Sequence, residues 1–102
     1  MSSTTQQVLK DLAEYQIPQN ALALASGIAG ATLSQWLRGV NGLPPATVER
    51  IEETLHAMMN LTHYRCDLPI AWSRVAEFLP LIERYRKEYV EHKFQTRAAS
   101  AK

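Results

Sequence analysis

The stretch IPQNALALASGIAGATLSQWLRG, residues 17–39, decides the expected fold. It contains two short helix-forming runs on either side of Gly27. Glycine adopts the left-handed backbone conformation without steric cost, so Gly27 is expected to end the first helix. Ile28 follows it and is expected to fill the gap between the two helices. The pattern predicts a helix-turn-helix, in which two short helices cross at a large angle.

The inner faces of these two predicted helices consist of small and apolar side chains. In the second helix, Leu33, Trp36 and Leu37 recur at the spacing that places them on one helical face. In the first helix the inner residues are mostly alanines, which let the helices cross closely: Ala21, Leu22, Ala23 and Ala25. These side chains are the expected contact between the helices.

This stretch resembles the helix-turn-helix of the Cro/CI-type (XRE-like) family, which comprises phage repressors and related bacterial regulators. The resemblance needs no gap, continues through VNGLPPATVERIEETL and covers about residues 8–59. The matching residues are Gln19, Ala23, Gly27, Ile28, Leu33, Trp36, Leu37 and Gly39. It implies an all-α fold, a compact lambda-repressor-like bundle of four helices followed by a C-terminal helical arm. In this family the second helix of the motif enters the DNA major groove.

The resemblance also implies which residues contact DNA. Gln19 stands where many members bind a phosphate and brace the recognition helix. Gly30 and Ala31 replace larger polar residues, so base contacts would fall to the remaining outward side chains of residues 30–38. The expected DNA-binding set is Gln19, Gly30, Ala31, Thr32, Ser34, Gln35, Arg38 and Asn41. A solvated helix face is the simpler alternative for Thr32, Ser34 and Gln35, and a turn-forming role is the simpler alternative for Asn41.

Two further helices complete the predicted DNA-binding domain, residues 1–60. The first is expected from Thr4 or Thr5 to Tyr15, and the last from Pro45 to about Asn60. Their predicted buried residues are Val8, Leu9 and Leu12 in the first and Val48, Ile51, Leu55 and Met58 in the last. The stretch from Leu61 to Pro69 shows no helical period and is predicted to be an extended connector.

The predicted second segment, residues 61–102, contains that connector and a C-terminal helix. Its apolar side chains keep one stripe in phase across Pro80, which predicts a bent helix or two helices packed on one surface. The stripe consists of Trp72, Val75, Phe78, Leu79, Ile82, Tyr85 and Tyr89. It could add a fifth helix to the core or join a second copy, and these two roles are compatible. We favour a homodimer interface, because repressors of this family pair to bind two half-sites.

The distribution of charge argues against DNA binding by the first segment. The chain has a net charge of +1, but residues 1–60 contain three basic and five acidic groups. Residues 61–102 contain eight basic and five acidic groups. Since phosphate neutralisation supplies most non-specific affinity for DNA, the missing cations must come from elsewhere. Helix N-terminal amides could hold phosphates without any side-chain charge, and the basic C-terminal segment could supply the missing cations.

Other classes of function lack a matching pattern. The single cysteine, Cys66, suits a reducing compartment, and no apolar run is long enough to span a membrane, so a cytoplasmic protein is expected. His56, His63 and Cys66 do not have a common zinc-site spacing, and a fourth ligand is missing. No phosphate-binding loop or catalytic spacing occurs. We therefore expect no enzymatic activity, no cofactor and no metal.

The sequence thus predicts a repressor-like transcriptional regulator that binds a palindromic operator in double-stranded DNA as a homodimer, through the helix around residues 30–38. The alternative is a protein-interaction module with the same fold, such as an antitoxin or an anti-repressor. The acidic first segment and the small side chains of AGAT, residues 29–32, motivate this alternative.

Overall fold

The computed structural model describes residues 3–64 and 72–100 of the chain, with side chains over 4–62 and 72–92. The fold is an all-α bundle, as predicted, and the described residues contain no strand. The elements in chain order are α1 (Ser3–Glu14), α2 (Gln19–Ser26), α3 (Gly30–Leu37), α4 (Pro45–Tyr64), the 3-10 helix η1 (Trp72–Phe78) and α5 (Leu79–Ser100).

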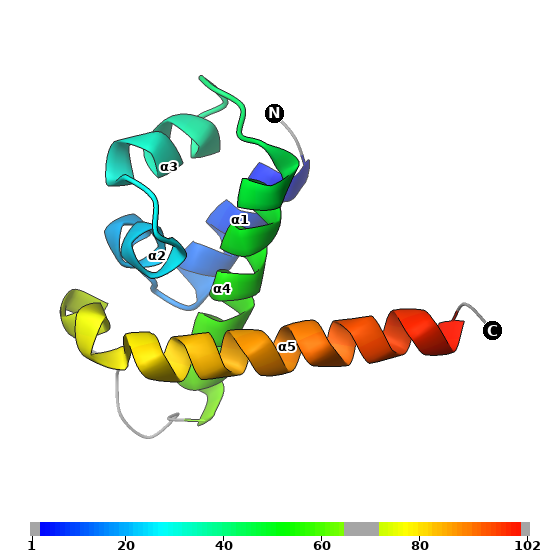
Figure 1. Ribbon diagram of the computed structural model, residues 1–102. Helices are drawn as coiled ribbons and strands as arrows, with labels where there is room; N and C mark the ends of the chain where they lie inside the picture. The colour runs from blue at the N-terminus through cyan, green and yellow to red at the C-terminus, as the bar shows by residue number, and fades with distance from the viewer. Residues whose placement is uncertain (1–2, 65–71, 101–102) are drawn as a thin grey trace.

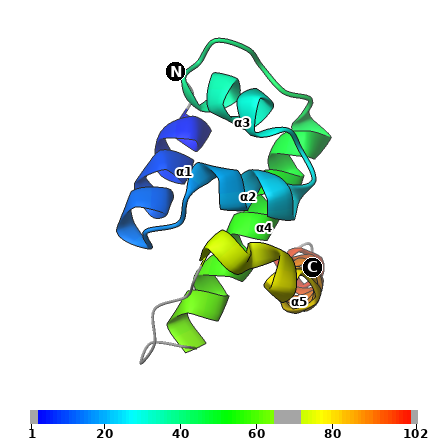
Figure 2. The ribbon, with the colours of Figure 1, turned by 90° about the vertical axis from the view of Figure 1, so that its left-hand side faces the viewer.

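The other helices are arranged around the long helix α4 (Figures 1 and 2). Helices α1, α2 and α3 surround its N-terminal part, and α3 lies at the end of the bundle from which α4 begins. Helix α5 crosses the C-terminal half of α4 and projects beyond the bundle (Figure 1). The most extensive helix–helix contact in the described structure is that between α4 and α5.

One hydrophobic core includes residues from every element. The predicted inner face of α3 is fully buried, and so is most of the predicted face of α4. Leu9, Ala25 and Val48 are only partly buried and pack against the edge of the core. The core consists of Val8, Leu12, Ile17, Ala21, Leu22, Ala23, Leu33, Trp36, Leu37, Ile51, Leu55, Ala57, Met58, Leu61, Trp72, Val75 and Ile82.

Helix α4 is longer than predicted. The expected extended connector is wrong over residues 61–64, where the helix continues to Tyr64. Leu61 is buried in the core because it follows Met58 by three residues and extends the same apolar face. The rest of the predicted connector, including Cys66, lies outside the described residues.

The C-terminal segment consists of two helical pieces, one of the two arrangements that the sequence predicted. Pro80 lies in the first turn of α5, where a backbone N–H would have no helical partner. The chain therefore changes direction just before Pro80, between η1 and α5. Both pieces contribute buried side chains to the same core, Trp72 and Val75 from η1 and Ile82 from α5.

Candidate nucleic-acid interface

The corner between α2 and α3 has the conformation predicted for it. Gly27 has φ of 77°, and its N–H donates to the Leu24 carbonyl at 3.2 Å. The Ile28 N–H donates to the Ala23 carbonyl at 3.0 Å, which completes the hydrogen-bond pair of a Schellman motif. Ile28 packs against the edge of the core. This closed turn fixes the direction in which α3 leaves α2.

A contact from α4 holds the same corner. Arg50 Nε donates a hydrogen bond to the Ser26 carbonyl oxygen at 2.9 Å. Because Ser26 is the last residue of α2, the bond connects the C-terminal end of that helix to α4. Together with the buried inner face of α3, it gives the helix-turn-helix a fixed position on the bundle.

The outer edge of α3 is open to solvent. Gly30, Ala31 and Thr32 are exposed, while Ser34 and Gln35 are half-buried. Arg38, just after the helix, is exposed, and its side chain forms no hydrogen bond or ion pair with the residues that the structure describes. These six residues form the α3 edge, the surface available for a ligand.

Neither helix of the motif has a side-chain cap at its N-terminus. Ala29 precedes α3 and Pro18 precedes α2, and neither forms a side-chain hydrogen bond to the first turn. Gln19, the first residue of α2, is exposed. Uncapped N-terminal amides and the helix dipole favour binding of an anion such as a phosphate group.

The side chain of Asn41, in the loop after α3, contacts that helix. Its Nδ2 donates a hydrogen bond to Gln35 Oε1 at 2.8 Å. This contact connects two residues of the predicted DNA-binding set, and the sequence analysis did not predict it. A pair six residues apart across a turn has no periodic signature, so only the geometry of the turn could have indicated the contact.

The described basic side chains of the C-terminal segment lie on η1 and α5, away from the α3 edge. Helix α5 crosses the opposite end of α4, and both views agree on this separation (Figures 1 and 2). The arginines of η1 and of the described part of α5 are also engaged with carboxylates: Arg74 with Glu77, Arg84 with Glu88, and Arg86 with Glu83 and Glu53. In this arrangement the described part of α5 supplies no free cation beside α3.

The ion pairs of Arg86 shift two pKa values. The hydrogen bond from Arg86 lowers the pKa of Glu83 below its ordinary value, although partial burial opposes this. The same hydrogen bond raises the pKa of Arg86. Arg86 also reaches Glu53 of α4 at 3.5 Å, so the network attaches α5 to α4.

The residues predicted to form a dimer interface make contacts within their own chain, and three of them are buried by it. Trp72, Val75 and Ile82 are buried in the core, which corrects their assignment to a contact with a second copy. Phe78 and Tyr85 pack against the same core, and the Tyr89 ring stacks on His56 with centroids 4.5 Å apart. Leu79 is half-buried beside Leu24 in a cleft between α2 and α5. An apolar stripe looks the same in a sequence whether it packs in its own chain or in another.

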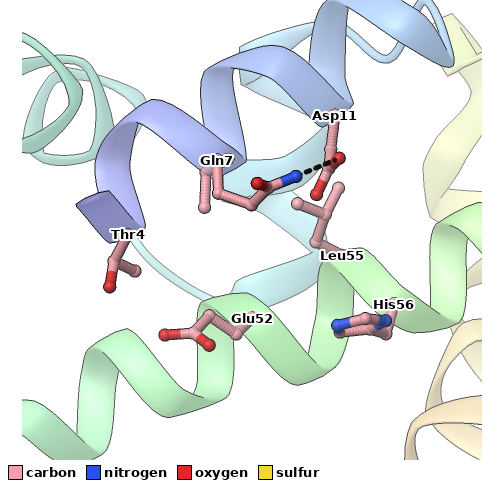
Figure 3. Close-up of a pocket in the computed structure, with 7 residues that line it drawn as sticks. Thr4, Gln7, Asp11, Glu52, Leu55 and His56 are labelled. Atoms are coloured by element: carbon pink, nitrogen blue, oxygen red, sulfur yellow. Dashed lines mark hydrogen bonds between the residues drawn. The ribbon is translucent and has the colours of Figure 1, made fainter.

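A separate cleft lies between α1 and α4 (Figure 3). Its volume is about 310 Å³, and Val8 and Leu55 line it together with polar residues. Gln7 Nε2 donates to Asp11 Oδ1 at 2.9 Å along one wall. The remaining lining residues are Thr4, Glu52 and His56. Two carboxylates and no lysine or arginine line the cleft, so its chemistry suits a cationic group.

The described residues contain no group of three or more histidine, cysteine, aspartate or glutamate side chains that could hold a metal. His63 and Cys66, considered above as ligands, fall outside the part of the chain whose side chains are described. Within that part, no helix is sufficiently long and apolar to cross a membrane.

Comparison with protein-family models, curated proteins and solved structures found no match to this chain.

Proposed function

We propose that the protein is a sequence-specific DNA-binding transcriptional regulator of the repressor type, which acts in the cytoplasm as a homodimer on a palindromic operator. The observation that carries the proposal is the placement of α3. Its inner face is locked in the core by Leu33, Trp36 and Leu37, while its outer edge is open. A rigid helix with one free polar edge is the element that direct readout in a major groove requires.

The proposed contacts follow from the exposed groups. The N-terminal half of α3 enters the major groove, where Gly30 and Ala31 allow close approach and the Ala31 methyl group can touch a thymine methyl. Thr32, Ser34 and Gln35 face the base edges. Gln19 and the uncapped amides of α2 bind one phosphate, and Arg38 binds another.

This interface would neutralise few phosphates. Arg38 is the unpaired side-chain cation of the α3 edge, and Arg50 is already engaged with the Ser26 carbonyl. Each phosphate neutralised by a cationic side chain contributes about −0.9 to the slope of log affinity against log salt concentration. The proposal therefore expects a shallow salt dependence, with specificity coming from base contacts and backbone amides.

The second copy must use a surface other than the buried part of the C-terminal stripe. Helix α5 projects beyond the bundle, which leaves its distal part free of the chain's own core (Figure 1). A homodimer that pairs through this projection would present two α3 edges to one duplex. Sedimentation equilibrium of the full chain with and without DNA measures the stoichiometry, and a monomer on each site would remove the dimer from the proposal.

The DNA-binding test begins with selection from a random duplex pool, followed by affinity measurements over a salt series. We expect Arg38→Ala to weaken binding to all sequences and to reduce the salt slope by about 1. Arg84→Ala is the matched control, because it removes the same charge from an exposed site on α5. Failure to select any sequence at low salt, or equal losses for both variants, would contradict the proposal.

A protein-interaction module, such as an antitoxin or anti-repressor, is the second candidate function. The acidic cleft between α1 and α4 favours it, because Asp11 and Glu52 would attract a basic segment of a partner protein. If this candidate is correct, Glu52→Lys should abolish capture of the product of a neighbouring gene. The same variant should leave DNA affinity unchanged if the α3 edge binds DNA.

A further inference from the structure

The turn after α3 fixes a loop residue beside the recognition helix. Gly39 has φ of 78°, its N–H donates to the Trp36 carbonyl at 3.0 Å, and the Val40 N–H donates to the Gln35 carbonyl at 2.9 Å. These two bonds turn the chain at the end of α3, and the Asn41 side chain reaches Gln35 of that helix. The position of Asn41 is therefore set by backbone hydrogen bonds.

The hydrogen bond between Asn41 and Gln35 has a direction. Asn41 Nδ2 is the donor and Gln35 Oε1 is the acceptor, at 2.8 Å. A glutamine amide offers one acceptor oxygen and one NH₂ donor group. Because Asn41 occupies one of the two lone pairs of this oxygen, the group of Gln35 that is wholly free for a ligand is its Nε2 donor.

We propose that Asn41 is a positioning residue that makes Gln35 a hydrogen-bond donor toward DNA, so that the α3 edge selects guanine or thymine at the base pair that Gln35 meets. The inference rests on the proposed DNA-binding function. In the major groove guanine presents the acceptors N7 and O6, and thymine presents the acceptor O4. Paired recognition of adenine needs the glutamine oxygen to accept from N6, and here that oxygen already accepts from Asn41, so adenine would have to use its second lone pair.

Asn41→Asp reverses this polarity in the same space. An aspartate carboxylate only accepts hydrogen bonds, so Gln35 must turn its Nε2 toward residue 41 and direct Oε1 outward. Gln35 then accepts from adenine N6 or cytosine N4. Gln35→Glu reaches the same outcome by another route, since Asn41 can donate to one carboxylate oxygen and leave the other outward.

The experiment selects duplexes from a random pool with the full-length wild type, Gln35→Ala, Asn41→Asp and Gln35→Glu. The position that Gln35 contacts is the one whose base preference disappears with Gln35→Ala. There we expect guanine or thymine with the wild type, and adenine or cytosine with both polarity variants, by about two- to tenfold for one hydrogen bond. Asn60→Asp on α4 adds the same charge at an exposed position remote from α3, and should keep the wild-type preference.

The possible outcomes distinguish a failure of this inference from a failure of the proposed DNA-binding function. If the wild type selects no sequence, the proposed function fails. If the wild type selects an operator but Asn41→Asp keeps guanine or thymine, or no position responds to Gln35→Ala, the inference fails and the function stands. A wild-type preference for adenine or cytosine at the responding position also overturns it. A purely structural role for Asn41 would change affinity and thermal stability without changing the chosen base.

Discussion

At the residue scale, Gln16 holds a conformation that favours glycine. Its φ is 55°, and its N–H donates to the Ala13 carbonyl at 3.3 Å where α1 turns into the next segment. A side chain in the left-handed region costs about 1 kcal/mol. We expect Gln16→Gly to raise the free energy of unfolding by about 0.5–1 kcal/mol, measured by urea denaturation.

The matched control for Gln16→Gly is the same substitution within α1. Gln6 is exposed and lies in regular helix, so Gln6→Gly should lower stability by about 1 kcal/mol. The sign of the two changes is the result that matters. If both variants are destabilised equally, the left-handed conformation of Gln16 does not limit stability.

Two buried hydroxyl groups lack partners within the described residues. Ser26 Oγ and Thr54 Oγ1 are inaccessible to solvent and form no hydrogen bond. An unsatisfied buried polar group costs free energy that an apolar group of the same shape does not. We expect Thr54→Val to raise the free energy of unfolding by about 1 kcal/mol.

Thr62→Val provides the comparison for Thr54→Val. The Thr62 hydroxyl donates to the Met58 carbonyl at 3.1 Å, so its loss should lower stability by about 0.5–1 kcal/mol. The midpoints of chemical denaturation should therefore move in opposite directions. A Thr54→Val variant that is destabilised as much as Thr62→Val would show that the Thr54 hydroxyl has a partner in solution.

At the element scale, the stability contributed by the ion pair between Glu83 and Arg86 within α5 should depend on pH. The folded-state pKa of Glu83 lies below its ordinary value of 4.5 because Arg86 donates a hydrogen bond to it. A carboxylate with a lowered pKa stabilises the fold above its unfolded pKa, and this contribution is lost as pH falls through the folded value. We expect Glu83→Gln to destabilise the protein near pH 7, and the difference from wild type to shrink below about pH 4.5.

Unfolding curves from pH 7 to pH 3 measure this effect. Glu91→Gln changes an exposed carboxylate on the same helix and should give a smaller difference. Since the Glu83 side chain is 40% exposed, solvent screening keeps the contribution modest. A Glu83→Gln difference that stays constant down to pH 3 would mean that the ion pair does not stabilise the fold.

The sequence predicted the helices correctly where a glycine turn or a regular spacing of apolar residues determines the local geometry. Gly27 ends α2, and Leu33, Trp36 and Leu37 form the inner face of α3, because a positive φ and a helical period leave few alternatives. The sequence does not show which surface an apolar helical face packs against, and for that reason Ile82 was predicted to contact a second copy although it is buried in its own chain. In the candidate site, the helical spacing of the buried residues of α3 also predicted which residues form its outer edge. That spacing did not predict the hydrogen bond from Asn41 to Gln35, because the bond depends on the path of a turn.

At the scale of the whole molecule, one core joins the helix-turn-helix to the C-terminal segment. Ile82 is fully buried against residues of the first segment, so its truncation should weaken the entire fold. We expect Ile82→Ala to cost about 2–5 kcal/mol. Because the core is shared, the loss should appear in one cooperative transition.

Two tryptophans report on the two parts of the chain. Trp36 lies in α3 and Trp72 in η1, and both are buried. Fluorescence of Trp36→Phe and Trp72→Phe variants should give coincident unfolding transitions, with and without Ile82→Ala. Separate midpoints would show that residues 1–60 and 61–102 unfold independently.

The most direct measurement of the central claim is an amide NMR titration of the full chain with a duplex obtained by selection. The proposed function predicts shift changes at Gln19, Asn20, Gly30–Gln35 and Arg38–Asn41, which decrease with a scrambled duplex of equal length. Changes confined to α5 or to the cleft between α1 and α4, with the α3 edge unaffected, would contradict it.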